Sequence, residues 1–342
     1  MKNHIATWIY LESKEEKSKY PNNKGDASSK SFQEVYWKCV ILFYETSLRY
    51  NPEAHHLLFS NSKELPIING FSVADFLEEN NIELITLPNK YPLPKNYFDR
   101  FRNQFFEFSI IDHVAQHINQ EDGFLLLDSD CIFTKPAAPL FQNLHNGYNA
   151  ITYVVDEERE YQVHGVTGKD MRTIFKDWGV ELKDNPFYCG GEVLLANGKF
   201  LKKVADHFPD LYKDMLDRNQ KNLPKFNEEA HTLSYYYYKH DALMNGLKPF
   251  IKRLWTNRNY FRNVEADSKN LTIWHLPNEK NTGLARLFEK HTMQRLSTME
   301  ETSFQELIYN ELLRAENYPI DWYLKFKNFL YKTSLFLGLK TK

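Results

Sequence analysis

Two aspartates spaced one residue apart, Asp128 and Asp130, have the types and spacing that most directly suggest chemistry in this chain. They follow an apolar run at 124–127 and precede a second apolar stretch that ends at Pro136. Two carboxylates this close repel each other in a low-dielectric site unless a cation lies near them. Such oxygen ligands favour Mg²⁺ or Mn²⁺, which commonly bridge a protein carboxylate to a substrate diphosphate. The alternative is an ordinary turn, in which the aspartates accept hydrogen bonds from nearby amides.

The segments before these aspartates alternate between strand and helix patterns. This alternation predicts an α/β fold with a mostly parallel, Rossmann-like central sheet flanked by helices. In such a sheet ligands bind beyond the carboxyl ends of the strands, which is where Asp128 and Asp130 would lie. The expected strands are 4–11, 55–61, 82–88 and 123–127, and the expected helices are Ser31–Tyr50 capped by Ser31, 71–81 capped by Ser72, and 97–116.

Beyond Pro136 the pattern is more mixed. A strand interrupted by Gly190 and Gly191 is expected at 187–198, and an amphipathic helix follows it. From about residue 290 the chain has helical spacing to its end. A further strand is expected at 148–155, and a late strand begins at 271 and runs into a loop that ends at 283. Further helices are expected at 165–182 and 227–240.

Composition narrows the class of protein. The chain has 342 residues with 42% hydrophobic and 15% aromatic content, which is enough to fill a core. A formal net charge of −2 gives no global basic field, so we expect no nucleic-acid partner. Three cysteines at unrelated spacings predict buried, reduced thiols. The densest apolar run, Cys39–Tyr44, is too short to span a bilayer and no signal peptide is evident, so a cytoplasmic location is expected.

The stretch Leu125–Phe141, "LLLDSDCIFTKPAAPLF", resembles the central signature of nucleotide-sugar glycosyltransferases with the GT-A fold, and is closest to the family 8-like group. The resemblance implies a GT-A catalytic domain at 1–290 and a helical C-terminal extension at 291–342. It implies that Asp130 ligates Mn²⁺ or Mg²⁺ and that Asp128 contacts the metal or the ribose of the donor. It also implies a nucleotide-sugar donor, most simply a UDP-sugar, and a glycan or lipid-linked acceptor in surface polysaccharide synthesis.

Two later segments extend the resemblance. In Phe187–Phe200, Gly190 and Gly191 would let a sugar approach the backbone, and a β-bulge at a sheet edge is the alternative. The family often has Asn-Ala-Gly here, so no donor-sugar preference transfers. In Thr272–Gly283, His275 would be the third metal ligand and Lys280 would meet the diphosphate, although the usual Lys-Pro-Trp is missing. A core histidine is the alternative reading of His275.

The resemblance also suggests catalytic and donor-binding residues. Glu228 and Glu229, with Glu192 third, are candidates for a general base on the acceptor hydroxyl. Glutamates in the first turn of a helix are also favoured by the helix dipole alone. Whether transfer retains or inverts the sugar configuration stays open. The family often has a basic residue on the helix before the paired aspartates, so Arg102 would lie near the nucleotide, and a solvated basic face is the alternative. By position only, Thr7 and Tyr10 on the first strand would hold the nucleobase.

The tail from residue 318 to 342 mixes aromatic residues with five lysines and one aspartate. Such a segment can lie on an anionic membrane surface, so peripheral contact with the inner face of the membrane is one expectation. The other is a helix packed on the domain with its lysines in solvent.

Two other functions remain open. A haloacid dehalogenase-like phosphatase would use Asp128, Asp130 and Thr134, but Thr134 is two positions too late and no Asp-Asp pair occurs. A GT-A-like scaffold that has lost turnover would bind a glycan or an assembly partner. The altered segment around His275 and Lys280 keeps this second possibility open.

Overall fold

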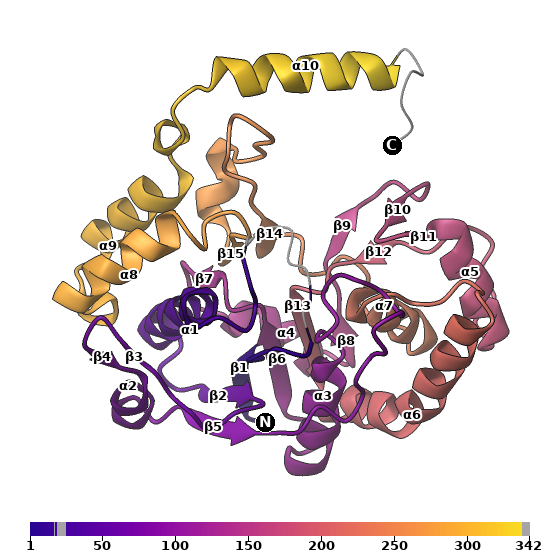
Figure 1. The fold of residues 1–342 in the computed structure, drawn as a ribbon. Helices are drawn as coiled ribbons and strands as arrows, with labels where there is room; N and C mark the ends of the chain where they lie inside the picture. Colours follow the sequence, from indigo (N-terminus) through magenta and orange to yellow (C-terminus); the bar gives the residue numbers. More distant parts are fainter. Residues whose placement is uncertain (17, 19–24, 337–342) are drawn as a thin grey trace.

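The computed structural model describes residues 1–16, 18 and 25–336 of the chain. At its centre is a six-stranded sheet with helices on both faces (Figure 1). The first four strands in the sheet order are parallel, and β13 is antiparallel to both of its neighbours. The mostly parallel sheet expected from the sequence is therefore confirmed. Its strands, in spatial order, are β5 (Glu83–Thr86), β2 (His55–Ser60), β1 (Asn3–Ile9), β6 (Gly123–Leu127), β13 (Val193–Asn197) and β8 (Ala150–Ile151).

Each face of the sheet is buried in its own hydrophobic core. Successive side chains of a strand point to opposite faces, so Leu125 and Leu127 of β6 enter one core and Phe124 and Leu126 the other. The first core contains α1 (Lys30–Tyr50), and the second contains α3 (Phe106–His117) and α6 (Gly198–Gln220), which pack together. A strand buried on both faces reads as a continuous apolar run, and that explains the sequence before Asp128.

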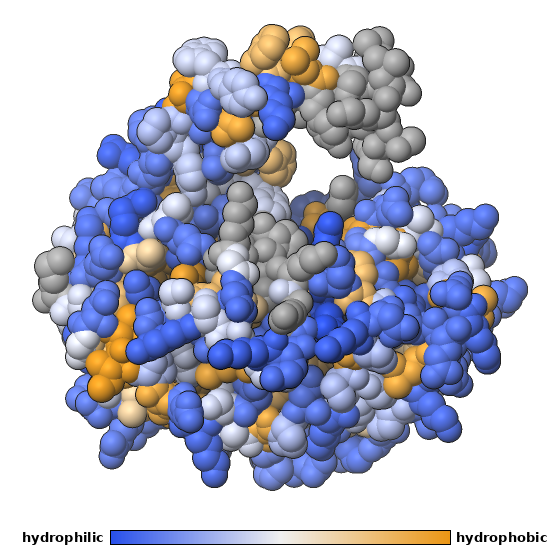
Figure 2. All heavy atoms as spheres, viewed as in Figure 1, coloured by the Kyte–Doolittle hydropathy of each residue, from blue (hydrophilic) through white to orange (hydrophobic). Residues whose placement is uncertain are grey.

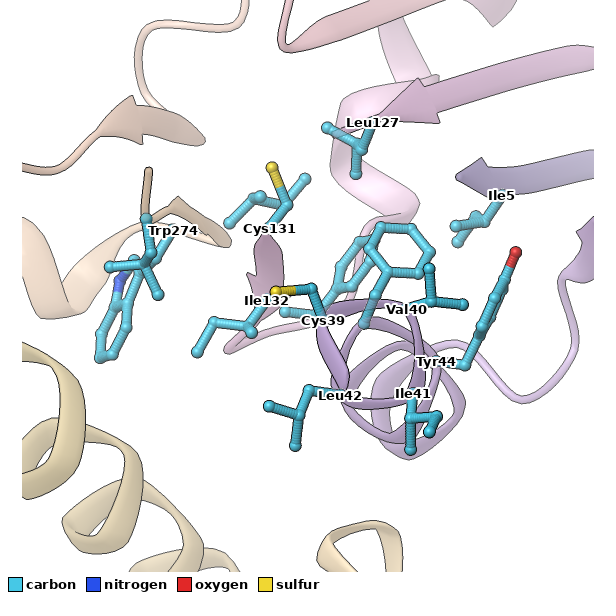
Figure 3. Close-up of a cluster of buried hydrophobic side chains, with 14 of the residues drawn as sticks. Ile5, Cys39, Val40, Ile41, Leu42, Tyr44, Leu127, Cys131, Ile132 and Trp274 are labelled. Atoms are coloured by element: carbon cyan, nitrogen blue, oxygen red, sulfur yellow. The ribbon is translucent and has the colours of Figure 1, made fainter. Parts of the chain in front are cut away.

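Figure 3 shows part of the first core, around the middle of α1. Residues 39–44, the densest apolar run of the sequence, are all fully buried in this helix. Val40 and Tyr44 lie toward Ile5 of the central sheet, while Cys39 lies toward Ile132. The three cysteines are free and buried, as expected from their spacing.

A smaller sheet of three strands stands beside the central one and extends the first core. Its order is β14 (Ile251–Arg253), β15 (Ile273–His275) and β7 (Cys131–Phe133). Strand β7 follows β6 directly after the Asp128–Asp130 turn, so the chain passes from one sheet to the other at this turn. The residues that could do chemistry therefore lie where the two sheets meet.

Short elements fill the periphery. The strands outside the two larger sheets are β3 (Ile67–Ile68), β4 (Phe71–Ser72), β9 (Val154–Asp156), β10 (Gln162–Val163), β11 (Val166–Thr167) and β12 (Tyr188–Cys189). The remaining helices of the body are α2 (Val73–Glu79), α4 (Ala138–His145), α5 (Gly168–Asp177) and α7 (Glu229–Lys239), with a short 3₁₀ helix at Ala266–Asn270.

The C-terminal part of the chain is helical and is attached to α1. Helix α8 contacts α1, and the expected domain boundary at residue 290 falls inside α8. Buried Glu45 on α1 accepts hydrogen bonds from Arg295 Nε at 2.7 Å and Ser297 N at 2.9 Å. Among the described residues, no helix combines the length and apolar character needed to cross a membrane. The elements are α8 (Gly283–Met293), 3₁₀ turns at Leu296–Thr298 and Ala315–Asn317, α9 (Glu301–Ile308), a π-helical turn at Tyr309–Leu313 and α10 (Trp322–Phe336).

Two expected helix starts are wrong. The cap of α1 is Ser29 rather than Ser31, because Ser29 Oγ accepts a hydrogen bond from Phe32 N at 3.3 Å. Helix α3 begins at Phe106 rather than at residue 97, because Phe101 has a φ of +47°, which a right-handed helix cannot contain. The segment before α3 is therefore a loop, and Arg102 lies in it.

Candidate functional site

Asp128 and Asp130 lie in a tight turn at the carboxyl end of β6. Cys131 N donates to Asp128 O at 3.0 Å, which closes the turn, and Asp128 N donates to Glu192 O at 3.1 Å, which ties it to the start of β13. The side chain of Asp128 is 35% exposed, whereas that of Asp130 is 2% exposed. One carboxylate therefore faces the solvent side of the site and the other its floor.

His275 reaches this turn because of the register of the small sheet. β15 runs antiparallel to β7 with His275 opposite Cys131, and Leu276 N donates to Asp130 O at 3.1 Å. The Nε2 atom of His275 lies 3.6 Å from Asp128 Oδ2 and 3.4 Å from Asp130 Oδ2. These three side chains offer ligand atoms that all lie within 4.8 Å of one another.

Lys280 completes the charge pattern around Asp130. Its Nζ donates a short hydrogen bond to Asp130 Oδ2. Burial alone would raise the pKa of Asp130, but Lys280 and His275 hold it well below its usual range. Burial, followed by the negative charge of Asp130, raises the pKa of Asp128 to about 6. The two aspartates are therefore inequivalent, and Asp130 carries the more firmly held negative charge.

Glu192 lies behind His275 as part of an ion pair. Arg253 contacts it with two nitrogens, Nε to Oε1 at 3.0 Å and Nη2 to Oε2 at 2.6 Å. His275 Nδ1 lies 3.4 Å from Glu192 Oε1. Burial alone would raise the pKa of Glu192, but Arg253 and His275 lower it to about 2. A carboxylate on the far nitrogen of a histidine orients the ring and directs its other nitrogen toward a metal.

A pocket opens beside the aspartates, between β1, α1 and the loop before α3. Its polar floor is formed by Asp128, Ser129 and Asp130 with Lys280. The remaining lining includes Trp8, Tyr10, Phe32, Tyr36, Asn103 and Gln104. An aromatic wall next to paired carboxylates suits a ligand that has a flat ring at one end and a metal-bound anionic group at the other.

The three residues expected near the nucleotide lie in different surroundings, and only one of them lines the pocket. Tyr10 lines the pocket, and its hydroxyl donates to Glu16 Oε1 at 2.6 Å. Thr7 is fully buried, and its hydroxyl donates to Leu127 O at 2.8 Å within the sheet. Arg102 donates to Glu16 O at 2.5 Å and Leu93 O at 3.2 Å, so it links two loops.

Gly190 and Gly191 lie between β12 and β13, where carboxylates approach the backbone closely. A Cβ atom on Gly190 would lie 2.2 Å from Glu192 Oε2, and one on Gly191 would lie 2.1 Å from Glu229 Oε1. A side chain at either position would have to displace one of these buried carboxylates, so contacts within the protein account for the two glycines independently of any sugar.

Glu228 and Glu229 start α7 and are buried below these glycines, each 3% exposed. Glu228 Oε1 accepts a hydrogen bond from Tyr188 OH at 2.5 Å, and its Oε2 lies 3.2 Å from His164 Nε2. Burial raises the pKa of Glu228 to about 7. Burial, and then the charges of Glu107, Glu228 and Asp128, raise the pKa of Glu229 well above its usual range.

Sequence reasoning missed Arg253 and Glu107. Glu107 is 2% exposed on α3, and burial followed by the charge of Asp128 raises its pKa well above the usual range. A lone glutamate inside the apolar run 105–111 was a signal for it, because glutamate is rarely buried without a role. Arg253 had no local signal, since its partner is 61 residues away.

The donor set at Asp128, Asp130 and His275 fits a divalent cation. Two carboxylate oxygens and one imidazole nitrogen are ligands that Mn²⁺ and Mg²⁺ accept, Mn²⁺ more readily because of the nitrogen. The Glu192 carboxylate on Nδ1 of the same histidine gives the ring the outer partner typical of metal-binding histidines. The Asp128 side chain, 35% exposed, leaves one side of the site open to the pocket.

Comparison with known proteins gives similarity in structure alone. No protein-family model matches the chain, and no curated protein sequence matches it. Mouse xyloside xylosyltransferase 1 in its apo form is similar at 14% identity and a TM-score of 0.46, over 80% of this chain and 97% of the other. An active-site mutant of LgtC is similar at 14% identity and a TM-score of 0.47, over 88% and 99%. Galactosyltransferase LgtC in complex with donor and acceptor sugar analogs is similar at 12% identity and a TM-score of 0.43, over 91% and 96%. Similarity at this level does not by itself transfer an activity.

Proposed function

We propose that the protein is a divalent-metal-dependent glycosyltransferase of the GT-A type. The proposed donor is a nucleotide sugar, specifically a UDP-sugar, and the acceptor is a glycan or lipid-linked hydroxyl in surface polysaccharide synthesis. The observation that carries this proposal is the convergence of Asp128, Asp130 and His275 at the carboxyl end of β6, beside an aromatic pocket. A cation held there would neutralise the diphosphate that leaves the sugar.

On the donor side, the protein groups have distinct roles in this proposal. Asp128, Asp130 and His275 hold the ion, and Glu192 orients the histidine. Lys280 adds a further positive charge next to Asp130, where the diphosphate would lie. The pocket wall formed by Trp8, Tyr10 and Tyr36 provides apolar area for the base and ribose.

On the acceptor side, Glu228 is the proposed general base. A base is most useful when its pKa lies near the working pH, and burial raises the pKa of Glu228 to about 7. Glu192 is committed to Arg253 by two hydrogen bonds, so its carboxylate suits orientation better than proton transfer. His164, whose side chain is 23% exposed, connects the buried Glu228 to the surface.

A thermal-shift panel of nucleotides and nucleotide sugars, with and without Mn²⁺, tests the donor site. Because a ligand that binds the native state raises the melting temperature, UDP with Mn²⁺ should give a larger shift than either alone. Asp130→Asn should remove the joint shift, because it removes a charged ligand from the floor of the site. Asp241→Asn, the same change at an exposed residue after α7, is the matched control. A wild-type protein with no shift for any nucleotide and metal would overturn the proposal.

The structure and an activity assay separate the proposed glycosyltransferase from the two alternative functions, a phosphatase and an inactive scaffold. A phosphatase would need Thr134 at the site, but this side chain is 1% exposed and its hydroxyl donates to Leu271 O at 2.6 Å. An inactive scaffold would show the joint UDP and Mn²⁺ shift without transferring or hydrolysing any UDP-sugar. A hydrolysis assay on the sugars that give the largest shifts therefore separates this scaffold from an enzyme.

A further inference from the structure

We propose that Glu279 and Tyr318 are positioning residues that hold Lys280 in the donor site, so that the C-terminal extension is a working part of this site. The inference rests on the proposed function, because it assigns Lys280 to the diphosphate of a nucleotide. It goes further by assigning a role to the extension and to a network of hydrogen bonds outside the metal group.

The carboxylate of Glu279 is the centre of this network. It is 1% exposed and accepts hydrogen bonds from Thr282 Oγ1 at 2.7 Å, Gly283 N at 2.9 Å and Tyr318 OH at 2.8 Å. Thr256 Oγ1 donates a further short hydrogen bond to it. A buried carboxylate with four donors has one stable orientation, and hydrogen bonds to charged groups are the stronger ones.

The loop that carries Lys280 is anchored through Glu279. The backbone of Glu279 donates to Leu276 O at 3.0 Å and accepts from Leu284 N at 2.9 Å. Leu276 in turn donates to Asp130 O at 3.1 Å, so the loop begins at the metal group and ends at α8. Lys280 follows Glu279 directly, and its Nζ returns to Asp130 Oδ2. The position of this ammonium group therefore depends on how firmly Glu279 is held.

Tyr318 connects the extension to this loop. Its hydroxyl reaches Glu279, 39 residues earlier in the chain, and lies 3.2 Å from Thr282 Oγ1. The tyrosine backbone is itself fixed, because Tyr318 O accepts from Arg258 Nε at 2.5 Å and Tyr318 N donates to Ala315 O at 3.2 Å. An extension that only covered the domain would not need a hydroxyl aimed at a buried carboxylate beside the site.

Calorimetry with a nucleoside diphosphate tests this role, with UDP and Mn²⁺ as the probe. Tyr318→Phe keeps the ring and removes one donor, so we expect UDP to bind on the order of tenfold more weakly. Uridine lacks the diphosphate that Lys280 would meet, so its binding should not change. Tyr309→Phe, an exposed tyrosine on the same extension, is the matched control and should bind UDP as the wild type does.

A double-mutant cycle separates positioning from a general structural effect. If Tyr318 acts through Lys280, Tyr318→Phe should cause no further loss of UDP affinity in a Lys280→Met background. Glu279→Gln, which replaces one carboxylate oxygen with an NH₂ group and so cannot accept from all four donors, should give the same pattern. Unchanged UDP affinity in both single variants, additive losses in the cycle, or an equal loss for uridine would each overturn the inference. No UDP binding by the wild type would instead refute the proposed function.

Discussion

Around His275 three carboxylates lie next to three cationic groups, so negative and positive charges are equal in number. The charges around Glu228, at the start of α7, are arranged differently. Asp128, Asp130 and Glu192 are matched by His275 itself, by Lys280 and by Arg253. Burial alone would lower the pKa of His275, but Asp130 and Glu192 raise it to about 9. For the proposed metal to bind Nε2 of this histidine, the ring would have to lose a proton, so metal affinity should rise with pH.

Glu228 contacts a tyrosine and a histidine rather than a lysine or arginine, and replacing it should lower activity while it raises stability at high pH. Below pH 7 the carboxyl is protonated and cannot act as a base, so the transfer rate should rise with pH to a plateau above about 7. Glu228→Gln should lower the rate by about 10²-fold or more and abolish this rise. Rates from pH 5 to 9 with a saturating UDP-sugar check it, and Glu64→Gln, an exposed glutamate, is the control. A Glu228→Gln variant with the wild-type pH profile would remove Glu228 as the base.

Glu228→Gln, which should lower activity, should raise the stability of the folded protein at high pH. Burial raises the folded-state pKa of Glu228 from its ordinary value of 4.5 to about 7, so stability is fully present below pH 4.5 and is lost as pH rises through 7. Glu228→Gln removes this loss, so at pH 8 its free energy of unfolding should exceed that of the wild type by about 1 to 3 kcal/mol. At pH 4 the two proteins should be equal. Urea unfolding at both pH values measures the difference. Equal free energies of unfolding at pH 8 would contradict the conclusion that the folded protein buries the charged carboxylate of Glu228.

At the level of secondary structure, the predictable features were those encoded locally. The apolar run before Asp128, the alternation of strands and helices, and the break at Gly190 and Gly191 all appear in the structure as expected. The start of α3 was not predictable from spacing, because the left-handed conformation of Phe101 interrupts a periodic pattern. Arg253 was hidden for another reason, since it meets Glu192 only through the pairing of β14 with β15. The metal-ligand roles of Asp128, Asp130 and His275 stay predictions.

The cap of α1 gives a test in which two serines are compared directly. Ser29 Oγ accepts from Phe32 N, whereas Ser31 is an exposed residue in the first turn. Ser29→Ala should lower the free energy of unfolding by about 1 kcal/mol, and Ser31→Ala should change it by less than about 0.5 kcal/mol. Chemical denaturation of both variants decides the point, and a larger effect at Ser31 would restore the cap expected from the sequence.

On the scale of the whole molecule, α10 stands apart from the body. Figure 1 shows it above the rest of the structure, and Figure 2 shows apolar side chains on it among polar ones. Trp322, Phe326 and Phe329 are exposed, each by more than half of the side-chain surface. Their spacing of four and three residues places them on one face of the helix. Lys340 and Lys342, which belong to the tail expected to contact the membrane, lie outside the described residues.

This helix is the proposed contact with the inner face of the membrane, and truncation after residue 320 should test it. The truncated protein should no longer float with anionic vesicles, while its UDP and Mn²⁺ binding should stay unchanged because Tyr318 is retained. Trp322→Ala with Phe326→Ala should weaken flotation, and Ile67→Ala, an exposed apolar residue elsewhere, should not. Flotation by the truncated protein equal to that of the full chain would exclude this contact.

The pairing of β7 with β15 has a consequence for the order in which the protein is made. Residues 131–133 are synthesised early but find their partners at 273–275, about 140 residues later. All six strands of the central sheet lie within residues 3–197, so its parallel strands can begin to pair while the rest of the chain is still on the ribosome, although α6, which helps to cover one face, follows directly after them. The candidate metal group is complete only after His275 has been synthesised. The hydrogen bond from Tyr318 to Glu279, which holds the loop of Lys280, can form only after Tyr318 has been synthesised. Nascent chains that stop before residue 275 should therefore fold a core without holding a metal, and maturation of the site is a late event of synthesis.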